Sequence, residues 1–393
     1  MLTLIKNVEL FSPAYEGTTD ILIAGNQIAS IAPNIDVPSS TIVAASGMQI
    51  DGTGLIALPG LVDSLVHISG GGGEGGFHTR TPQMALTEAS LHGVTTVIGA
   101  LGTDATTRTL PDLIAKAKGL DIEGISAYCY TGSYHLPART VTGSITDDIL
   151  LIDCMIGIGE VAIADHRASE PTYRELAQVA AQSRTGGMLS GKGGIVYIHT
   201  GDGNSQLSVL HEVIEKTDIP PSQFYPTHIN RNQSLLEAGI KWTRCGGVID
   251  MTTSTNEQFI TEGEIPAAEA IAYCINQGVP VTQLSMSSDG NASLPIFDNS
   301  AKLTGLEVGR VSSLFAEFKA LVLNHNIALQ DAIQIVSTTP AHFLKLSQKG
   351  KIHKGCDADI VLCEKDNLTI KHVIAKGKCL VSNGEAIVKG TFE

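Results

Sequence analysis

Short apolar runs alternate with longer amphipathic segments through the middle of the chain. The runs have the length of buried strands, and most of the segments between them have a helical pattern. Eight strands separated by helices over about 230 residues are typical of a (β/α)8 barrel. The runs begin at Leu61, Val94, Ile125, Ile156, Ile195, Phe224, Val248 and Leu284, and the helical patterns include Glu170–Ser183, Gln206–Lys216, Ala267–Gln277 and Val308–Asn324.

Both ends of the chain differ from the middle, because they consist of short β-rich runs joined by turns. The segment Asp20–Ile31 predicts two strands around a Gly-Asn turn, and Asp359–Cys363 and His372–Ala375 predict two more strands near the C-terminus. We therefore expect a small β-sandwich domain made of residues 1–57 and 344–393. It would be attached to an α/β barrel over residues 58–343.

A run of glycines, Gly70–Gly73, follows the first predicted strand of the middle region. In an open doubly wound sheet, which is the alternative to a barrel, a Gly-rich fingerprint of fixed spacing follows the first strand and leads into a helix. Consecutive glycines lack that spacing. We therefore interpret the run as a loop over the mouth of a barrel.

Composition and charge exclude two classes of protein. The 393 residues are 43% hydrophobic and 17% charged, which is the opposite of the composition of disordered chains. The formal net charge is −14, and no cluster of Lys and Arg occurs. Binding to nucleic acid requires such clusters, because they neutralise phosphates. We expect a folded, acidic protein that does not bind nucleic acid.

The cysteines and the N-terminus bear on the compartment. The seven Cys include no CxxC pair, so we expect reduced, mostly buried thiols and no disulfide framework. The first residues lack the pattern of a secretory signal, and no apolar run approaches the length that crosses a bilayer. We expect a soluble cytoplasmic protein without a membrane partner. The cysteines are Cys129, Cys154, Cys245, Cys274, Cys356, Cys363 and Cys379.

Polar side chains capable of chemistry follow five of the predicted barrel strands. These strands end at His67, near Glu160, at His199, at His228 and at Asp289. A single His in such a place is more often a hydrogen-bonded polar residue, and an Asp before Gly is common in turns. In a barrel, however, the carboxyl ends of all strands meet at one mouth. Three His and two carboxylates that converge there indicate a site for a divalent metal.

The motifs around these residues resemble a known family. Pro59–Asp63 followed by His67, together with the later His and Asp residues and the tail Gly350–Val361, is similar to the amidohydrolase superfamily. Within the superfamily, the chain resembles the isoaspartyl dipeptidases over essentially its whole length. The segments that carry this closer resemblance are Gly70–Glu74, Thr79–Pro82, Leu101–Asp104, Thr131–His135, Asp165–Arg167, His199–Asp202, Thr227–Arg231 and Ser288–Asn291.

The resemblance implies a set of catalytic roles. His199 and His228 would be zinc ligands. Asp289 would be the general base, taking a proton from the attacking water and passing it to the leaving amine. Tyr134 would donate a hydrogen bond to the scissile carbonyl oxygen.

The resemblance also implies a set of substrate contacts. Glu74 would bind the free α-amino group of the substrate. Arg231 and Ser293 would bind the α-carboxylate that the isopeptide linkage leaves free, and Arg167, with Thr103 nearby, would bind the carboxylate of the leaving amino acid. This set suits the charges of a β-aspartyl dipeptide, because Arg binds planar carboxylates in a bidentate fashion.

The chain departs from the family pattern at two positions. The family carries His-x-His at the end of the first strand, whereas here Leu65 precedes His67. The family also carries a carboxylated Lys on the fourth strand, and here Glu160 occupies that place. No Lys occurs between Lys118 and Lys192, so a carboxylated Lys from this strand is excluded.

These departures favour one metal over two. Leu cannot bind a metal, and a Glu side chain is shorter than a carboxylated Lys and bridges two ions less easily. Glu160, His199 and His228 still form a three-ligand set with room for water, as in catalytic zinc sites. His67 is expected to be a weaker ligand, and Asp289 a further ligand if a second metal binds.

The sequence therefore predicts a zinc-dependent hydrolase, a metallopeptidase that cleaves the isopeptide bond of β-aspartyl dipeptides. One alternative is an amidohydrolase for another N-acyl amino acid or a cyclic amide. The other is a catalytically impaired homologue that binds dipeptides without cleaving them. The expected partner is a small dipeptide. By resemblance alone we also expect a homo-oligomer, with an octamer as the assembly that the family suggests.

Overall fold

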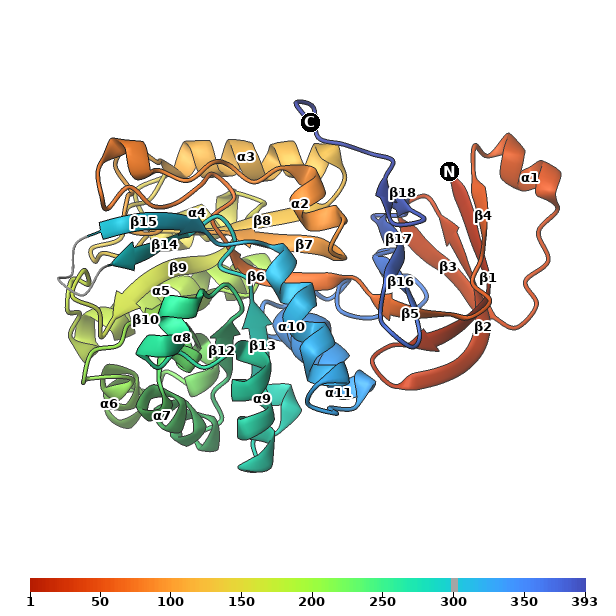
Figure 1. Ribbon diagram of the computed structural model, residues 1–393. Helices are drawn as coiled ribbons and strands as arrows, with labels where there is room; N and C mark the ends of the chain where they lie inside the picture. The colour runs from red at the N-terminus through yellow and green to blue at the C-terminus, as the bar shows by residue number, and fades with distance from the viewer. Residues whose placement is uncertain (298–302) are drawn as a thin grey trace.

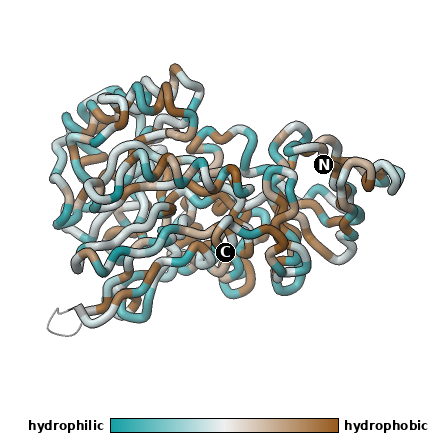
Figure 2. Tube along the Cα trace, turned by 90° about the horizontal axis from the view of Figure 1, so that it is seen from above, coloured by the Kyte–Doolittle hydropathy of each residue, from teal (hydrophilic) through white to brown (hydrophobic). Residues whose placement is uncertain are grey.

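The computed structural model describes residues 1–297 and 303–393 and has two parts (Figure 1). An α/β barrel forms the larger part, and a β-rich part made from both ends of the chain lies beside it. Apolar stretches run through both parts in Figure 2, so each has apolar chain to bury. Within the described residues, no helix combines the length and the apolar character needed to cross a bilayer.

The barrel strands run parallel in chain order. A six-stranded sheet is followed by a parallel pair, and the ring closes between the last strand and the first. At this closure, the backbone N–H of Asp289 donates to Leu65 O (3.1 Å), and that of His67 donates to Gly290 O (2.8 Å). The sheet consists of β6 (Leu61–Val66), β7 (Val94–Gly99), β8 (Ser126–Thr131), β9 (Met155–Ile163), β10 (Ile195–Thr200) and β11 (Phe224–Thr227), and the pair of β12 (Ile249–Thr252) and β13 (Leu284–Ser287).

The helices lie outside the strands and follow the predicted pattern with two differences. The helix predicted to end at Ser183 continues to Ser190. Within this extension Gly187 packs so closely against Gly194 that a Cβ atom would lie 2.6 Å from the Cα atom of that residue. The helix predicted from Val308 begins at Ser312, because the preceding residues form a strand of a β-hairpin.

The helical segments between the strands range from single turns to five turns. They are α2 (Leu86–Ser90), α3 (Leu110–Glu123), α4 (Ile145–Leu151), α5 (Tyr173–Ser190), α6 (Ser208–Lys216), α7 (Gln233–Arg244), α8 (Glu257–Glu262), α9 (Ala267–Asn276), α10 (Ser312–Leu323), α11 (Leu329–Ile333) and α12 (Thr339–Phe343), with short turns at Phe77–Thr79, Pro221–Gln223, Ile229–Arg231, Val281–Gln283 and Gln334–Thr338. The hairpin strands are β14 (Ser293–Phe297) and β15 (Leu303–Val308).

Strands from both termini form one nine-stranded sheet. The strand β5 (Leu55–Pro59) lies between β1 (Leu2–Phe11) and β16 (Ile360–Glu364), so the N-terminal and C-terminal segments pair directly. Buried apolar side chains such as Ile21 and Ile360 form a separate core for this part. The domain boundaries at 57/58 and 343/344 remain a prediction, and the first of them falls within β5, which continues to Pro59. The other members are β2 (Tyr15–Ala24), β3 (Gln27–Ala32), β4 (Met48–Asp51), β17 (Ile370–Ala375), β18 (Lys378–Ser382) and β19 (Glu385–Ala386), and α1 (Ser39–Ala44) lies at the edge.

Candidate active site

A pocket of about 460 Å³ opens at the carboxyl ends of the barrel strands. Its volume is within the usual range for small-ligand sites. Every site residue predicted from the sequence lines it except Glu160, which contacts three of the lining residues. The lining residues from the prediction are His67, Glu74, Thr103, Tyr134, Arg167, His199, His228, Arg231, Asp289 and Ser293.

Glu160, His199 and His228 come together from three consecutive strands. Glu160 Oε1 lies 2.6 Å from His199 Nδ1 and 3.2 Å from His228 Nε2, and all three side chains are buried. Their ligand atoms lie within 4.8 Å of one another. Glu160 is not the last residue of its strand, because pairing with β10 continues as far as Ile163. Its side chain nevertheless faces the site.

This group fits a divalent cation. Among the described residues, Glu160 Oε2 is buried and accepts no hydrogen bond, which is costly for a carboxylate oxygen that is not paired or bound to a metal. Burial, with the neighbouring His199 ring and the positive charge of Arg231, lowers the pKa of His228 to about 4, so the His228 ring is neutral as a metal ligand must be. Two imidazoles and one carboxylate are a common ligand set for zinc.

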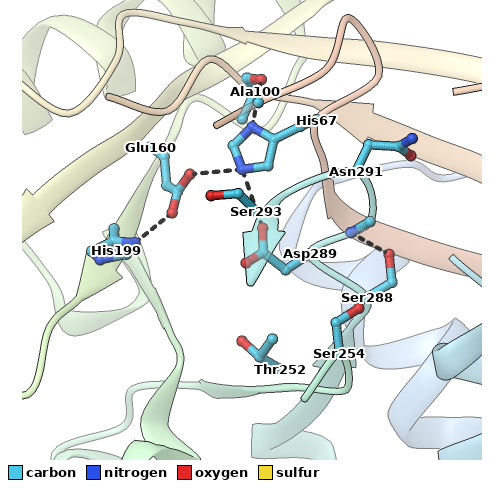
Figure 3. A network of polar contacts seen from close by, with 12 residues as sticks. His67, Ala100, Glu160, His199, Thr252, Ser254, Ser288, Asp289, Asn291 and Ser293 are labelled. Atoms are coloured by element: carbon cyan, nitrogen blue, oxygen red, sulfur yellow. Dashed lines mark hydrogen bonds and ion pairs between the residues drawn. The ribbon is translucent and has the colours of Figure 1, made fainter. Parts of the chain in front are cut away.

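His67 is not part of the three-residue group but lies between two carboxylates, those of Glu160 and Asp289 (Figure 3). Its Nε2 is 3.2 Å from Asp289 Oδ1 and 3.7 Å from Glu160 Oε2, and its Nδ1 donates to Ala100 O (3.2 Å). Burial disfavours a charged ring, but the contact with Asp289 and the charges of both carboxylates raise the pKa of His67 to about 9. Asp289 is thereby held in place at the edge of the pocket.

The side chain of Leu65 is fully buried in an apolar cluster inside the barrel. Val62, Ile98 and Tyr130 belong to the same cluster. Leu65 therefore contributes to packing where the family pattern has a His.

Glu74 is the centre of a second polar group at the mouth of the pocket. Its Oε1 accepts a hydrogen bond from Thr103 Oγ1 (2.7 Å) and lies 3.6 Å from Arg167 Nη1, and its Oε2 accepts from Ser293 Oγ (3.5 Å). Thr103, Arg167 and Ser293, all predicted substrate contacts, therefore lie around Glu74. The pocket thus places the carboxylate of Glu74 beside the guanidinium group of Arg167.

Tyr134 and Arg231 both contact His199, one of the three candidate ligands. Tyr134 Oη lies 2.8 Å from His199 Nδ1, and the guanidinium of Arg167 lies 5.4 Å from the centre of the Tyr134 ring. Burial and the nearby charge of Glu160 raise the pKa of Tyr134 well above its ordinary value, so its hydroxyl keeps the proton and can donate it in a hydrogen bond. Arg231 Nη2 lies 3.5 Å from His199 Nε2.

Two crystal structures of beta-aspartyl dipeptidase from Fervidobacterium islandicum AW-1 resemble this chain throughout. They are 41% and 40% identical to it, with TM-scores of 0.89 and 0.87, and each comparison covers 98% of both chains. The first is a complex with the beta-Asp-Leu dipeptide.

The chain belongs to the amidohydrolase family. The model of the amidohydrolase family matches residues 224–380. An allantoinase from Enterococcus faecalis is 22% identical over 91% of this chain and 86% of its own length. A D-hydantoinase structure with 17% identity and a TM-score of 0.68 shares the fold. The protein is therefore a hydrolase, as the sequence predicts.

Asp165 is a residue of this amidohydrolase to which the sequence assigned no role. Its carboxylate accepts two hydrogen bonds from the guanidinium of Arg167, at Nε (2.9 Å) and Nη2 (2.7 Å). Its Oδ2 also lies 2.9 Å from His199 Nε2. The Asp-x-Arg spacing was the signal in the sequence, but the contact with His199 depends on the tertiary structure.

Two further polar residues of the pocket lining support the amidohydrolase site. Thr252 Oγ1 bonds to His228 Nδ1, which leaves Nε2 directed at Glu160. Arg108 is buried and donates to the backbone carbonyls of Ser69, Gly71 and Thr81 in the Gly-rich loop. Neither belongs to a motif that the sequence made conspicuous.

Proposed function

We propose that this amidohydrolase cleaves the isopeptide bond of β-aspartyl dipeptides with one zinc ion held by Glu160, His199 and His228. The observation that carries the proposal is the charge pattern of the pocket. Besides the ligand histidines, the pocket lining includes the carboxylate of Glu74 and the guanidinium groups of Arg167 and Arg231. Other acidic residues line it as well, and two of them are paired within the site, Asp165 with Arg167 and Asp289 with His67. A β-aspartyl dipeptide has the complementary charges, one ammonium and two carboxylates. The beta-Asp-Leu dipeptide in the Fervidobacterium islandicum structure supports this substrate class.

The zinc site would supply one part of the chemistry. A zinc ion bound there lowers the pKa of water towards neutrality and polarises a carbonyl group. The protein supplies three ligands, so at least one coordination position is left for water or substrate. His67 is excluded from this set in the proposal, because its two ring nitrogens already contact Ala100 and Asp289.

Asp289 moves the proton in the proposed reaction. It takes a proton from the attacking water and later gives it to the leaving amine. Support comes from its position at the pocket edge and from the contact with His67, which orients the carboxylate. The hydroxyl group of Tyr134 donates a hydrogen bond to the carbonyl oxygen as negative charge develops there.

The remaining polar residues bind and orient the substrate in the proposal. Glu74 binds the α-ammonium group, and Arg231 with Ser293 binds the free α-carboxylate. Arg167 with Thr103 binds the carboxylate of the leaving amino acid. These contacts hold the scissile amide over the three-ligand group, and such orientation supplies much of the rate enhancement in hydrolases.

Zinc content and a substrate panel test the proposal together. The zinc-loaded protein is expected to hold one tightly bound zinc per chain and to hydrolyse β-Asp-Leu faster than α-Asp-Leu, N-acetyl-leucine or a cyclic imide. Two tightly bound zinc ions would refute the single-metal site. Turnover of the cyclic imide alone would favour the alternative amide substrate, and zinc binding without any turnover would favour the impaired binder.

Asp289→Asn is the matched variant for this experiment. It is expected to keep its zinc and lower kcat by about 10²- to 10⁴-fold, the range typical of a lost general acid–base group. Unchanged kcat in this variant would remove Asp289 from the mechanism.

A further inference from the structure

Two cysteines touch each other on the outside of the catalytic pocket. Cys129 lies in β8, and Cys154 lies in the turn immediately before β9. This is the amino end of β9, whereas the carboxyl ends of the strands form the pocket. Neither cysteine lines the pocket, so the proposed hydrolysis makes no use of them.

The geometry of the pair is close to that of a disulfide. The two Sγ atoms are 3.8 Å apart, and the backbone N–H of Cys129 donates to Cys154 O at 2.8 Å. Backbones joined in this way lie about 5 Å apart, within the usual Cα separation of disulfides. An S–S bond is about 2.05 Å long, so the two sulfurs have to approach by less than about 2 Å to form it.

The two thiols have different environments. Cys129 is buried, and the contact with Cys154 together with burial raises its pKa well above the ordinary value. Cys154 is partly exposed; the same contact and the charges of Lys118 and Lys192 outweigh burial and lower its pKa to about 7. Lys192 is fixed near the turn, because its Nζ donates to Ile149 O and Ile152 O, both at 2.7 Å. Cys154 therefore has the character of an attacking thiolate, and Cys129 that of a resolving thiol.

We propose that Cys129 and Cys154 are a modification site at which a hydroperoxide forms an intrachain disulfide in the folded protein. The Cys154 thiolate attacks one peroxide oxygen and breaks the O–O bond, giving a sulfenic acid and an alcohol, or water in the case of hydrogen peroxide. The sulfur of Cys129 then attacks the sulfur of Cys154, the S–O bond breaks, and water leaves. The two thiols lose two electrons in total, and the peroxide gains them.

Other cysteines of the chain provide the contrast. Cys245 is exposed, and among the described residues its thiol contacts Lys241 O and no other thiol. Cys274 and Cys363 are buried, which raises the pKa of each to about 12, and within the described residues neither contacts another thiol. Cys245 therefore serves as an internal reference for an accessible thiol without a thiol neighbour.

The test exposes the reduced full chain to one equivalent of hydrogen peroxide at pH 7, followed by peptide mass spectrometry without reductant. We expect a crosslinked peptide pair containing Cys129 and Cys154, lighter by two hydrogen atoms. A thiol with a pKa near 7 is about half ionised at this pH, against a few per cent for an ordinary thiol. The first step, attack of Cys154 on the peroxide, is therefore expected to be about tenfold faster than the same step at a thiol of ordinary pKa.

Three variants sharpen the experiment. Cys129→Ser is expected to leave a sulfenic acid at Cys154 that dimedone traps, Cys154→Ser to abolish the crosslink, and Cys245→Ser to leave it unchanged. Oxidation of Cys245 without a crosslink in the wild-type chain would overturn the proposal. A crosslink that forms only in guanidinium chloride would also overturn it, because the pair would then not be reactive in the native fold. The wild-type result decides the matter even if a variant fails to fold.

Discussion

At the scale of single residues, Asp165 connects the metal group to the substrate contacts. Its carboxylate holds the guanidinium of Arg167 in a bidentate pair and faces His199 Nε2. The other ring nitrogen of His199 faces Glu160. A carboxylate behind a ligand imidazole fixes the tautomer and the ring orientation, and its loss commonly lowers metal affinity about 10- to 100-fold. Asp165 is therefore expected to act on zinc binding and on KM together.

Asp165→Asn tests this double role. We expect zinc affinity to fall about 10- to 100-fold and KM for β-Asp-Leu, at saturating zinc, to rise about tenfold, because Arg167 loses a charged bidentate partner. Competition with a chromogenic chelator and steady-state kinetics measure the two effects. Asp147→Asn makes the same chemical change at an exposed position in α4 and is expected to change neither. Wild-type values of both quantities in Asp165→Asn would contradict the assignment.

At the scale of elements, the Gly-rich loop depends on one buried side chain. Arg108 donates through Nη2 to Gly71 O (3.0 Å) and Thr81 O (2.9 Å), and through Nη1 to Ser69 O. A Cβ atom at Gly70 would lie 2.6 Å from Arg108 Nη1, so the loop and the guanidinium fit only with glycine there. The loop carries Glu74, which lines the pocket.

Arg108→Lys is expected to loosen this loop. The single ammonium group cannot reproduce a planar fork that serves three carbonyls, so we expect a destabilisation of about 1–3 kcal/mol. KM for β-Asp-Leu should rise several-fold while kcat changes less, since Glu74 binds substrate and does not react. Kinetics and urea unfolding measure these changes. Arg139→Lys, at an exposed residue that donates to one backbone carbonyl, is the control and is expected to match the wild type in both. An unchanged KM for Arg108→Lys would separate the loop from substrate binding.

At the scale of the whole molecule, a buried Lys joins the barrel to the terminal sheet. Lys349 Nζ lies 2.6 Å from Ser126 Oγ at the start of β8, 2.6 Å from Asp359 Oδ2 just before β16, and 2.8 Å from Asp357 Oδ2. Its side chain is 2% exposed. Breaking one partner of a buried ion pair leaves an uncompensated charge.

Lys349→Met is therefore expected to lower the free energy of unfolding by about 3–5 kcal/mol, because Asp359 keeps its negative charge in a buried place. Urea denaturation followed by circular dichroism measures the loss. Lys365→Met removes an exposed pair with Glu9 and is expected to cost less than about 1 kcal/mol. Equal effects of the two substitutions would mean that the buried pair does not join the two parts energetically.

The sequence by itself determined the eight barrel strands, the terminal β segments and the cluster of strand-end residues. Strand length, apolar pattern and order along the chain are local properties, and parallel strands place their carboxyl ends at one mouth. His199, His228 and Asp289 could therefore be assigned to one pocket without coordinates. Local pattern was less informative at α10, where a run of helical character continues from β15 into the helix.

Only the tertiary structure decided which of these side chains touch. It placed His67 between Asp289 and Glu160, outside the ligand group that Glu160 forms with the two later His residues. It also brought the guanidinium group of Arg108 to the carbonyl groups of the Gly-rich loop, and the thiol of Cys129 into contact with that of Cys154. Such contacts depend on rotamers and on strand register across the barrel, and neither is encoded in the local period of the sequence.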